Sequence, residues 1–377
     1  MSQKLKIALL PLHSFSNPGG VKNHVLALKE EFKKRGHSVK IIIPRRYPRE
    51  KYDKDIKLLG TSFPFPFNGS QGDLTFCFNP RSIDKFLKKE KFDILHFHNF
   101  GPHSWQILEK SHAKINVLTF HSYIDLKTNK FFKAFPFLLD LFKKAVNKRI
   151  SGVIGIAPFD LDIFNNFKAP KTVIPNGIDL ERFNLAVPKI KKFLDGKINI
   201  LFVGRIEERK GLVYLIKAYK SLKKKHKNIR LIIVGEGNLK KECQNLVKEK
   251  KIRDAFFEGK VEGDRIPAYF ATCDIFAAPA IYGESFGIVL LEAMASGKPV
   301  VGFAIPAYKE VLKGKGREFL VKPEDWRALA RKIEILIEDE EKRKEMGEWG
   351  QKEVKSYSWD IVTEKVLDFY QKLLTNL

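Results

Sequence analysis

Short apolar runs rich in β-branched residues recur along the chain, and amphipathic stretches of helical length separate them. In the first half these runs cover residues 6–10, 39–43, 93–97, 116–120, 152–157 and 172–174. In the second half they cover residues 198–203, 230–234, 275–278 and 299–303. Strands that alternate with helices are typical of a parallel sheet with helices on both faces. We therefore predict an α/β protein with two doubly wound domains.

The pattern is interrupted after Phe183, where NLAVPKIKKFLDGK carries a proline and a charge cluster but no clean period. We expect an N-terminal domain over residues 1–185 and a C-terminal domain over residues 186–356. The last segment, residues 357–377, has apolar residues at helical spacing. It either caps the second domain or crosses back to the first, and we place it with the first.

Composition narrows the class of protein. A chain of 377 residues that is 44% hydrophobic is too long for one ordinary core and too apolar to be disordered. No window approaches 18 uninterrupted apolar residues, and Pro11 and His13 interrupt the apolar start, so we expect neither a membrane span nor a signal peptide. The 3 cysteines lie far apart, which supports neither a disulfide framework nor a thiolate zinc site. A cytoplasmic protein fits best.

The formal net charge of +25 calls for an anionic partner: nucleic acid, an anionic lipid surface or a phosphorylated substrate. A nucleic-acid-binding protein would carry a basic tract or stripe with base-stacking aromatics, and no such motif occurs, so we expect no nucleic acid partner. A dinucleotide oxidoreductase would share the fold. Its G-x-G-x-x-G fingerprint fails here, because GEGNLK at residues 235–240 lacks the third glycine.

Two glycine-containing turns between a strand and a helix are candidates for binding phosphate. Gly19 and Gly20 follow the first predicted strand, where glycine lets the backbone approach a ligand and the helix start attracts an anion. In the second domain Gly204 ends a strand, and Arg205 and Lys210 lie in the connection before the next helix. Ligands bind at this edge of open α/β sheets, and both cations suit phosphate oxygens. The alternatives are an ordinary turn and a solvated charge cluster.

The run GESFGIVLLEAMASGKPVV starts at Gly283, after the predicted strand 275–278, and Ser285 is a fair N-cap for its helix. Glu284 and Glu292 are eight residues apart, at most about 12 Å along a helix axis. Their carboxylates suit a ligand that lies across the helix start and offers sugar hydroxyls. Alternatively, Glu284 interacts with the helix dipole and Glu292 faces solvent, although apolar neighbours argue against exposure of Glu292.

Together with VGRIEERKG, VIPNGID, IVGEG and the Gly19-Gly20 loop, this run resembles the motifs of the retaining family-4 glycosyltransferases. Within that family the chain is most similar to the phosphatidylinositol mannosyltransferases, through GGVKNHV, PFNGS, DILHFH and VLTFHS. The resemblance implies the GT-B fold, in which two Rossmann-like domains face across a cleft. It also implies transfer of a hexose from a nucleotide-diphosphate sugar.

The resemblance further implies the roles of individual residues. Arg205 and Lys210 would neutralise the donor diphosphate, where negative charge grows as the sugar–phosphate bond breaks. Glu284 would contact the transferred sugar, Glu292 the ribose hydroxyls, and His121 would lie beside the reacting centre. The expected donor-binding residues are Gly19, Gly20, Gly204, Glu292, Ser285, Phe286, Gly287 and Ile288.

The donor that the resemblance favours is GDP-mannose, with a UDP-sugar as the alternative. No cofactor and no metal are expected, because Arg, Lys and a helix terminus can stabilise the leaving group. Of the two D-x-D strings, residues 53–55 lie in a charge-rich loop and residues 160–162 would be an acidic first turn. The pair His96 and His98 could bind a metal, but without a carboxylate or thiol nearby they either line the cleft or are hydrogen-bonded core residues.

The acceptor side of the family is the first domain, which holds most of the surplus charge and most of the phenylalanines. The segment 126–149 could bind a membrane, with aromatics inserted and basic residues at anionic headgroups, or it could be an ordinary helix that packs into the core. The residues expected at the membrane or acceptor are Lys130, Phe131, Phe132, Lys143, Lys144 and Lys148. We expect a peripheral enzyme at the inner face of the membrane that uses a lipid or lipid-linked glycan, with a soluble sugar as the alternative.

This chain departs from the inositol-lipid enzymes in two stretches: after His98, where it reads Asn99-Phe100-Gly101-Pro102, and after Asn68-Gly69-Ser70. These enzymes carry a basic residue suited to the acceptor phosphate after the N-G-S motif, whereas this chain reads Gln71-Gly72-Asp73. Inositol lipid is therefore not implied as the acceptor, and other anionic lipids or lipid-linked glycans remain.

Overall fold

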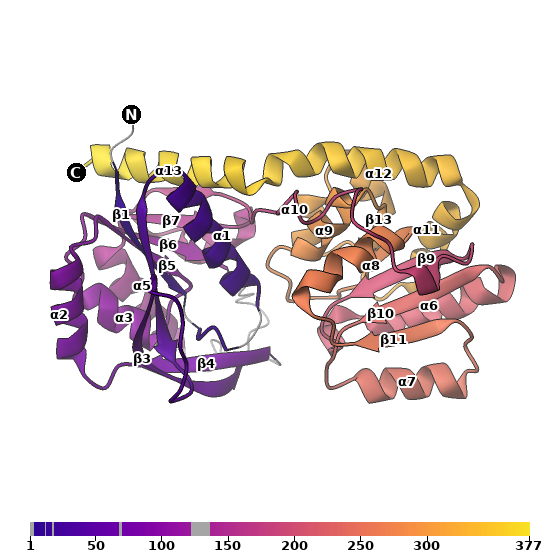
Figure 1. The fold of residues 1–377 in the computed structure, drawn as a ribbon, viewed down its shortest axis with the longest axis horizontal. Coiled ribbons are helices and arrows are strands. Elements are labelled where there is room, and N and C mark those ends of the chain that lie inside the picture. The colour runs from indigo at the N-terminus through magenta and orange to yellow at the C-terminus, as the bar shows by residue number, and fades with distance from the viewer. Residues whose placement is uncertain (1–3, 12, 17–18, 68–69, 122–135) are drawn as a thin grey trace. The chain divides into compact units, whose positions relative to one another are not determined.

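The computed structural model describes residues 4–11, 13–16, 19–67, 70–121 and 136–377. The chain forms two compact units, Met1–Gly177 with Trp359–Leu377, and Ile178–Ser358. Each unit contains a parallel sheet with helices on both faces, which confirms the predicted fold class (Figure 1). The boundary predicted after residue 185 falls in the segment that leads from Gly177 to the first strand of the second unit.

The sheet of the first unit has, among the described residues, eight strands in the order β4-β3-β2-β1-β5-β6-β7-β8. All neighbours are parallel except β3 and β4, which form an antiparallel hairpin at one edge. The strands are β1 (Lys6–Pro11), β2 (Ser38–Arg45), β3 (Ile56–Phe67), β4 (Ser70–Phe76), β5 (Ile94–His98), β6 (Ile115–Phe120), β7 (Gly152–Gly155) and β8 (Lys171–Val173).

Successive side chains of the central strands enter two different cores, because side chains alternate across a strand. Ile7 and Leu9 of β1 pack with α1 and α13, whereas Ala8 and Leu10 pack with α2, α3 and α5 on the other face. Among the described residues, the helices of this unit are α1 (Gly20–Lys34), α2 (Pro80–Glu90), α3 (Pro102–Glu109), α5 (Pro136–Arg149) and α13 (Trp359–Thr375). Thus α13, the last helix of the chain, runs beside α1 and belongs to the first unit (Figure 1).

The sheet of the second unit is entirely parallel, in the order β11-β10-β9-β12-β13-β14 among the described residues. Its strands are β9 (Ile198–Val203), β10 (Ile229–Val234), β11 (Ala255–Gly259), β12 (Ile275–Ala278), β13 (Val300–Phe303) and β14 (Leu320–Val321). The helices are α6 (Leu212–Lys225), α7 (Lys240–Glu249), α8 (Ile266–Thr272), α9 (Ile288–Ala295), α10 (Pro306–Val311), α11 (Trp326–Glu338) and α12 (Glu340–Val354).

Both D-x-D strings lie where the sequence places them. Asp53 and Asp55 are in the turn before β3 and pair with lysines of α1. Asp160 is in the first turn of a 3₁₀ helix, Pro158–Phe164, where its Oδ2 accepts a hydrogen bond from the backbone of Ala157 at 2.9 Å. Among the described residues no helix combines the length and apolar character that crossing a membrane requires.

Candidate active site

The loop after β9 in the second unit carries a dense group of cations. Arg205 follows β9, and a short 3₁₀ turn, Glu208–Lys210, leads into α6. Gly211 joins the turn to α6 with a φ of +67°. A Cβ at Gly211 would lie 1.9 Å from the carbonyl oxygen of Pro279, just after β12, so only glycine fits. This close approach brings the cationic turn against the loop that follows β12.

Glu284, in that second loop, interacts with two of the cations. Its Oε1 lies 2.5 Å from Nζ of Lys210 and 2.8 Å from Nη1 of Arg209. Glu207 extends the network, at 3.1 Å from Nε of Arg209 and 2.8 Å from Nη1 of Arg205. Burial disfavours the charged carboxylate, but Lys210 and Arg209 outweigh this effect and hold the pKa of Glu284 below its usual value. These five side chains form one ion-pair network at the sheet edge where α/β folds bind ligands.

The helix after Glu284 begins later than the sequence predicts. Its first residue is Ile288, and its N-cap is Gly287 with a φ of +92° and no side-chain cap bond. A Cβ on Gly287 would lie 2.7 Å from the ring of Tyr308. The predicted capping role of Ser285 is therefore wrong, because a left-handed glycine starts the helix and Ser285 lies before it. Phe286, also expected in the donor site, is buried.

Glu292 is half-buried in α9, whereas its apolar neighbours Leu290 and Leu291 are fully buried. Burial raises the pKa of Glu292 to about 7, and the charge of Arg182 opposes this rise. Near neutral pH the carboxyl group can therefore accept and, when protonated, donate hydrogen bonds. Both properties suit recognition of ligand hydroxyls.

In the first unit, Gly19 and Gly20 stand at the start of α1. Gly19 has extended backbone, and a Cβ on either glycine would meet no described atom within 4 Å. Packing against described residues therefore does not explain these two glycines, and close approach of a ligand remains the prediction for them.

Asp73 anchors the segment between β1 and α1. Its carboxylate is 2.7 Å from Nη1 of Arg46 and accepts a hydrogen bond from the backbone nitrogen of Ser14 at 3.2 Å. Both charged side chains are largely buried. The stretch Gln71-Gly72-Asp73, where the resemblance leads us to expect a basic residue, thus holds an acid whose charge is neutralised by Arg46.

Histidines gather at the carboxyl ends of β5 and β6. Nδ1 of His98 and Nε2 of His121 are 3.0 Å apart, and the backbone nitrogen of His121 donates to Asn99 at 2.7 Å. His96 bonds Thr119 at 2.6 Å and the hydroxyl of α13's Tyr370 at 2.5 Å. His96 is therefore a hydrogen-bonded core residue, one of the two alternatives that the sequence left open.

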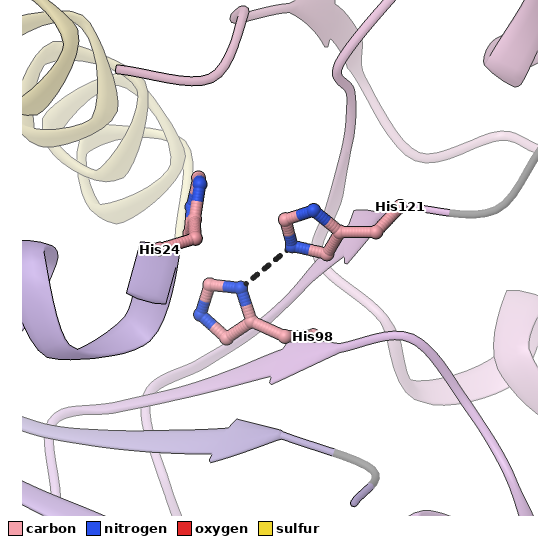
Figure 2. Close-up of side chains that lie close together, drawn as sticks. All are labelled: His24, His98 and His121. Atoms are coloured by element: carbon pink, nitrogen blue, oxygen red, sulfur yellow. Dashed lines mark hydrogen bonds between the residues drawn. The ribbon is translucent and has the colours of Figure 1, made fainter. Parts of the chain in front are cut away.

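His24, on α1, joins this group. Its Nδ1 lies 2.9 Å from Oδ1 of Asn176, and its ring centroid is 4.7 Å from that of His121. Burial lowers the pKa of His24 to about 4 and of His96 to about 3, and it holds the pKa values of His98 and His121 well below the ordinary value. All four imidazoles are therefore neutral at pH 7. Figure 2 shows His24, His98 and His121 arriving from three elements.

Comparison with known proteins accounts for both units. The family models described as Glycosyltransferase Family 4 and Glycosyl transferases group 1 match residues 18–182 and 186–353. The phosphatidyl-myo-inositol mannosyltransferase of Mycobacterium leprae is 30% identical over 383 residues, which cover 99% of this chain and 98% of that protein. The chain belongs to the family-4 glycosyltransferases.

Solved structures confirm that this glycosyltransferase has the GT-B fold. Sucrose-phosphate synthase of Thermosynechococcus elongatus has a TM-score of 0.76 at 19% identity, with 99% of this chain and 100% of that chain covered. Anabaena HepE, in complex with UDP and glucose, has a TM-score of 0.74 at 19% identity, with 97% and 99% covered. The predicted enzyme class, a hexosyltransferase, is confirmed by the family.

The glycosyltransferase brings together three of its predicted catalytic residues, Arg205, Lys210 and Glu284, through the ion-pair network. Sequence reasoning missed Arg209, which it treated as an intervening charge, although the spacing of the cations in RIEERKG was a usable signal. It also missed His24, because nothing near this residue in sequence indicates that α1 packs beside β5 and β6.

The predicted membrane segment is only partly described. Lys130, Phe131 and Phe132 lie outside the described residues, whereas Lys143, Lys144 and Lys148 are on α5. Lys144 and Lys148 are exposed and Lys143 is half-buried.

Proposed function

We propose that this glycosyltransferase transfers mannose, with retention of configuration, from GDP-mannose to a lipid or lipid-linked glycan at an anionic membrane surface. The observation that carries the proposal is the ion-pair network at the edge of the second sheet. It occurs in a chain that is 30% identical to a phosphatidyl-myo-inositol mannosyltransferase. That name supports mannose as the sugar and a lipid as the acceptor.

The donor diphosphate is assigned to Arg205, Arg209 and Lys210. When the bond between the sugar and the diphosphate breaks, negative charge develops on the leaving phosphate oxygen, and fixed cations lower the energy of that state. Glu284 holds Lys210 and Arg209 in place through its 2.5 and 2.8 Å contacts. The same carboxylate is an acceptor for a hydroxyl of the transferred sugar.

In the retaining route, the departing phosphate oxygen helps to remove the proton from the acceptor hydroxyl, so no carboxylate nucleophile is needed. His121 contributes a neutral imidazole to the reacting sugar, because burial keeps its pKa far below the ordinary value. The charge that a metal ion would supply at the diphosphate is supplied by side chains. We therefore propose transfer without a metal cofactor.

An exposed stripe on α5 supports the membrane surface. Phe137 and Leu141 are 57% and 49% exposed, and Lys144 and Lys148 follow them on the same helical face at a spacing of three and four residues. Apolar side chains next to lysines suit the boundary between acyl chains and anionic headgroups. The proposed location is the cytoplasmic face of the membrane.

Because of Asp73, we propose only the class of the acceptor, a lipid or lipid-linked glycan, and not an inositol lipid in particular. Its carboxylate is neutralised by Arg46, so this position supplies no free cation for the phosphate of an inositol lipid. An acceptor phosphate would have to be bound elsewhere, and a neutral sugar hydroxyl of a lipid-linked glycan would not need such a cation.

A matrix of donors and acceptors tests the proposal. Labelled GDP-mannose, UDP-glucose and ADP-glucose are each incubated with the purified protein and with either a membrane lipid extract or soluble sugars. We expect label from GDP-mannose in the organic phase. Transfer from a UDP-sugar alone would refute the donor, label in soluble sugars alone would refute the acceptor, and absence of any transfer would refute both.

A further inference from the structure

Three histidines of the first unit form a compact set of nitrogen donors. His24 comes from α1, His98 ends β5 and His121 follows β6 (Figure 2). Their ring centroids are 4.7, 5.2 and 5.3 Å apart, so the rings form a nearly equilateral triangle. One nitrogen from each ring lies within 4.8 Å of the other two.

The three rings do not use all of their hydrogen-bonding nitrogens within the described part of the chain. His98 is fully buried, and its Nε2 has no hydrogen-bond partner among the described residues. His24 and His121 are 5% and 8% exposed, so water has little access to them. A buried polar nitrogen without a partner is unfavourable, which indicates that the described residues alone do not complete this cluster.

We propose that His24, His98 and His121 bind one divalent late first-row transition metal ion, with Zn²⁺ as the natural candidate. Neutral imidazole nitrogen is the donor that Zn²⁺, Co²⁺, Ni²⁺ and Cu²⁺ accept readily. Three protein ligands leave one position of a tetrahedral ion open. The nitrogens of a zinc site lie about 3.3 Å apart, as bond lengths of about 2.0 Å require, so the ring of His24 moves slightly toward the other two on binding.

Asn176 prepares His24 for this role. Because the amide oxygen can only accept, Nδ1 of His24 carries the hydrogen in their 2.9 Å contact, and Nε2 keeps its lone pair. A hydrogen bond from the outer nitrogen of a metal-binding histidine to an oxygen is the usual way in which its ring and tautomer are fixed. The 3.0 Å contact between Nδ1 of His98 and Nε2 of His121 is a hydrogen bond, so the nitrogen of His98 that is open to an ion is its unpartnered Nε2.

The consequence for the enzyme rests on the proposed function, which places His121 beside the reacting sugar. An ion that holds the His121 ring removes it from the substrate, so the metal opposes transfer. The site is thus inhibitory and separate from the metal-free chemistry at the diphosphate.

Metal binding is measured directly, without reference to activity. The full-length protein is stripped with a chelator and titrated with Co²⁺, whose visible absorption reports low-coordinate nitrogen sites. We expect one Co²⁺ per chain, displaced by Zn²⁺. Asn176→Ala should weaken binding about 10–100-fold, as loss of a partner behind a ligand does, and His24→Gln should weaken it further. His226→Gln is the control, because His226 lies 3.0 Å from Glu334 in the second unit, in a second group of described side chains that lie close enough together to hold an ion.

Two results would overturn the proposal: wild-type protein that binds Co²⁺ no better than His24→Gln, or loss of the absorption in His226→Gln. Asn176→Ala keeps all three imidazoles, so it decides the question even if His24→Gln does not fold. Co²⁺ binding in a protein without transferase activity would refute the proposed function and leave the metal site standing. Active enzyme that does not bind Co²⁺ would refute the metal site and leave the proposed function standing.

Discussion

One carboxylate oxygen of Glu284 forms ion pairs with both Lys210 and Arg209, so each of the three side chains is held in position by the others. A carboxylate between two cations keeps them in position and reduces their mutual repulsion before the diphosphate arrives. Lys210, Arg205 and Glu284 could be predicted, because a strand, a short loop and a helix place them at one sheet edge. Arg209 was missed although its place between Arg205 and Lys210 was a usable signal, and it is the 3₁₀ turn that brings its guanidinium to Glu284.

Replacing Glu284 by Gln should impair sugar transfer more than nucleotide affinity. The amide keeps the shape but loses the charge that we propose contacts the sugar, while the cations remain available to the diphosphate. We expect kcat to fall about 100-fold or more, with the Kd for GDP unchanged or lower. Steady-state kinetics and calorimetry measure the two quantities, and a weaker Kd with normal kcat would remove Glu284 from the sugar.

Glu292 should make the protein less stable as the pH rises. Its pKa is raised from 4.5 to about 7, so between these values the folded state binds more protons than the unfolded state. Stability therefore falls as the pH rises through this window. Glu292→Gln lacks this titration. Between pH 5 and pH 8 the free energy of unfolding of wild type should therefore fall by about 1–3 kcal/mol relative to that of Glu292→Gln. Thermal unfolding of both proteins at the two pH values checks this, and equal changes in both would contradict it.

At the scale of elements, the hydrophobic pattern was sufficient for the buried parallel strands. Every strand predicted from it exists, because central strands of a parallel sheet are apolar on both faces. The hairpin of β3 and β4 was missed, since Pro64 and Pro66 argue against a strand. They are tolerated here because this part of β3 pairs with β4 alone, beyond the end of its pairing with β2. The start of α9 was misplaced because a left-handed glycine leaves no side-chain capping signal.

Gly211 connects the cationic turn to α6, and Gly211→Ala should destabilise the protein by at least about 1–3 kcal/mol. The added Cβ would collide with the carbonyl oxygen of Pro279. Gly196→Ala is the matched control, because Gly196 has a φ of +83° but no atom within 4 Å of the added Cβ. The free energies of unfolding of both variants are measured in denaturant. If both variants lose the same amount, the positive φ, and not the close approach to Pro279, explains why residue 211 is glycine.

Charge reversal on the exposed face of α5 should reduce membrane binding. Lys144→Glu with Lys148→Glu replaces attraction to anionic headgroups by repulsion, at about 1 kcal/mol for each lysine lost. Sedimentation with anionic and with neutral vesicles measures the effect. Reversal of the exposed Lys344 and Lys352 on α12 is the control, and unchanged binding in the α5 variant would refute the interfacial role.

For the whole molecule, the order of motifs along the chain predicted the fold and the family, and two of the motifs, VGRIEERKG and GESFGIVL, lie at turns between a strand and a helix. What sequence could not provide is the packing of distant segments. The return of α13 places Tyr370 on His96, and α1 places His24 beside His121. These contacts depend on tertiary structure, so spacing in the sequence carried no signal for them.

The central claim is that Lys210 and its neighbouring arginines stabilise the charge that develops on the donor diphosphate. It is tested most directly by the kcat of Lys210→Ala with GDP-mannose and a lipid extract, beside Lys224→Ala, an exposed lysine on α6. We predict that kcat falls about 100–1,000-fold in Lys210→Ala, with the thermal midpoint retained, and is unchanged in Lys224→Ala. A kcat of Lys210→Ala within about twofold of wild type would contradict the claim.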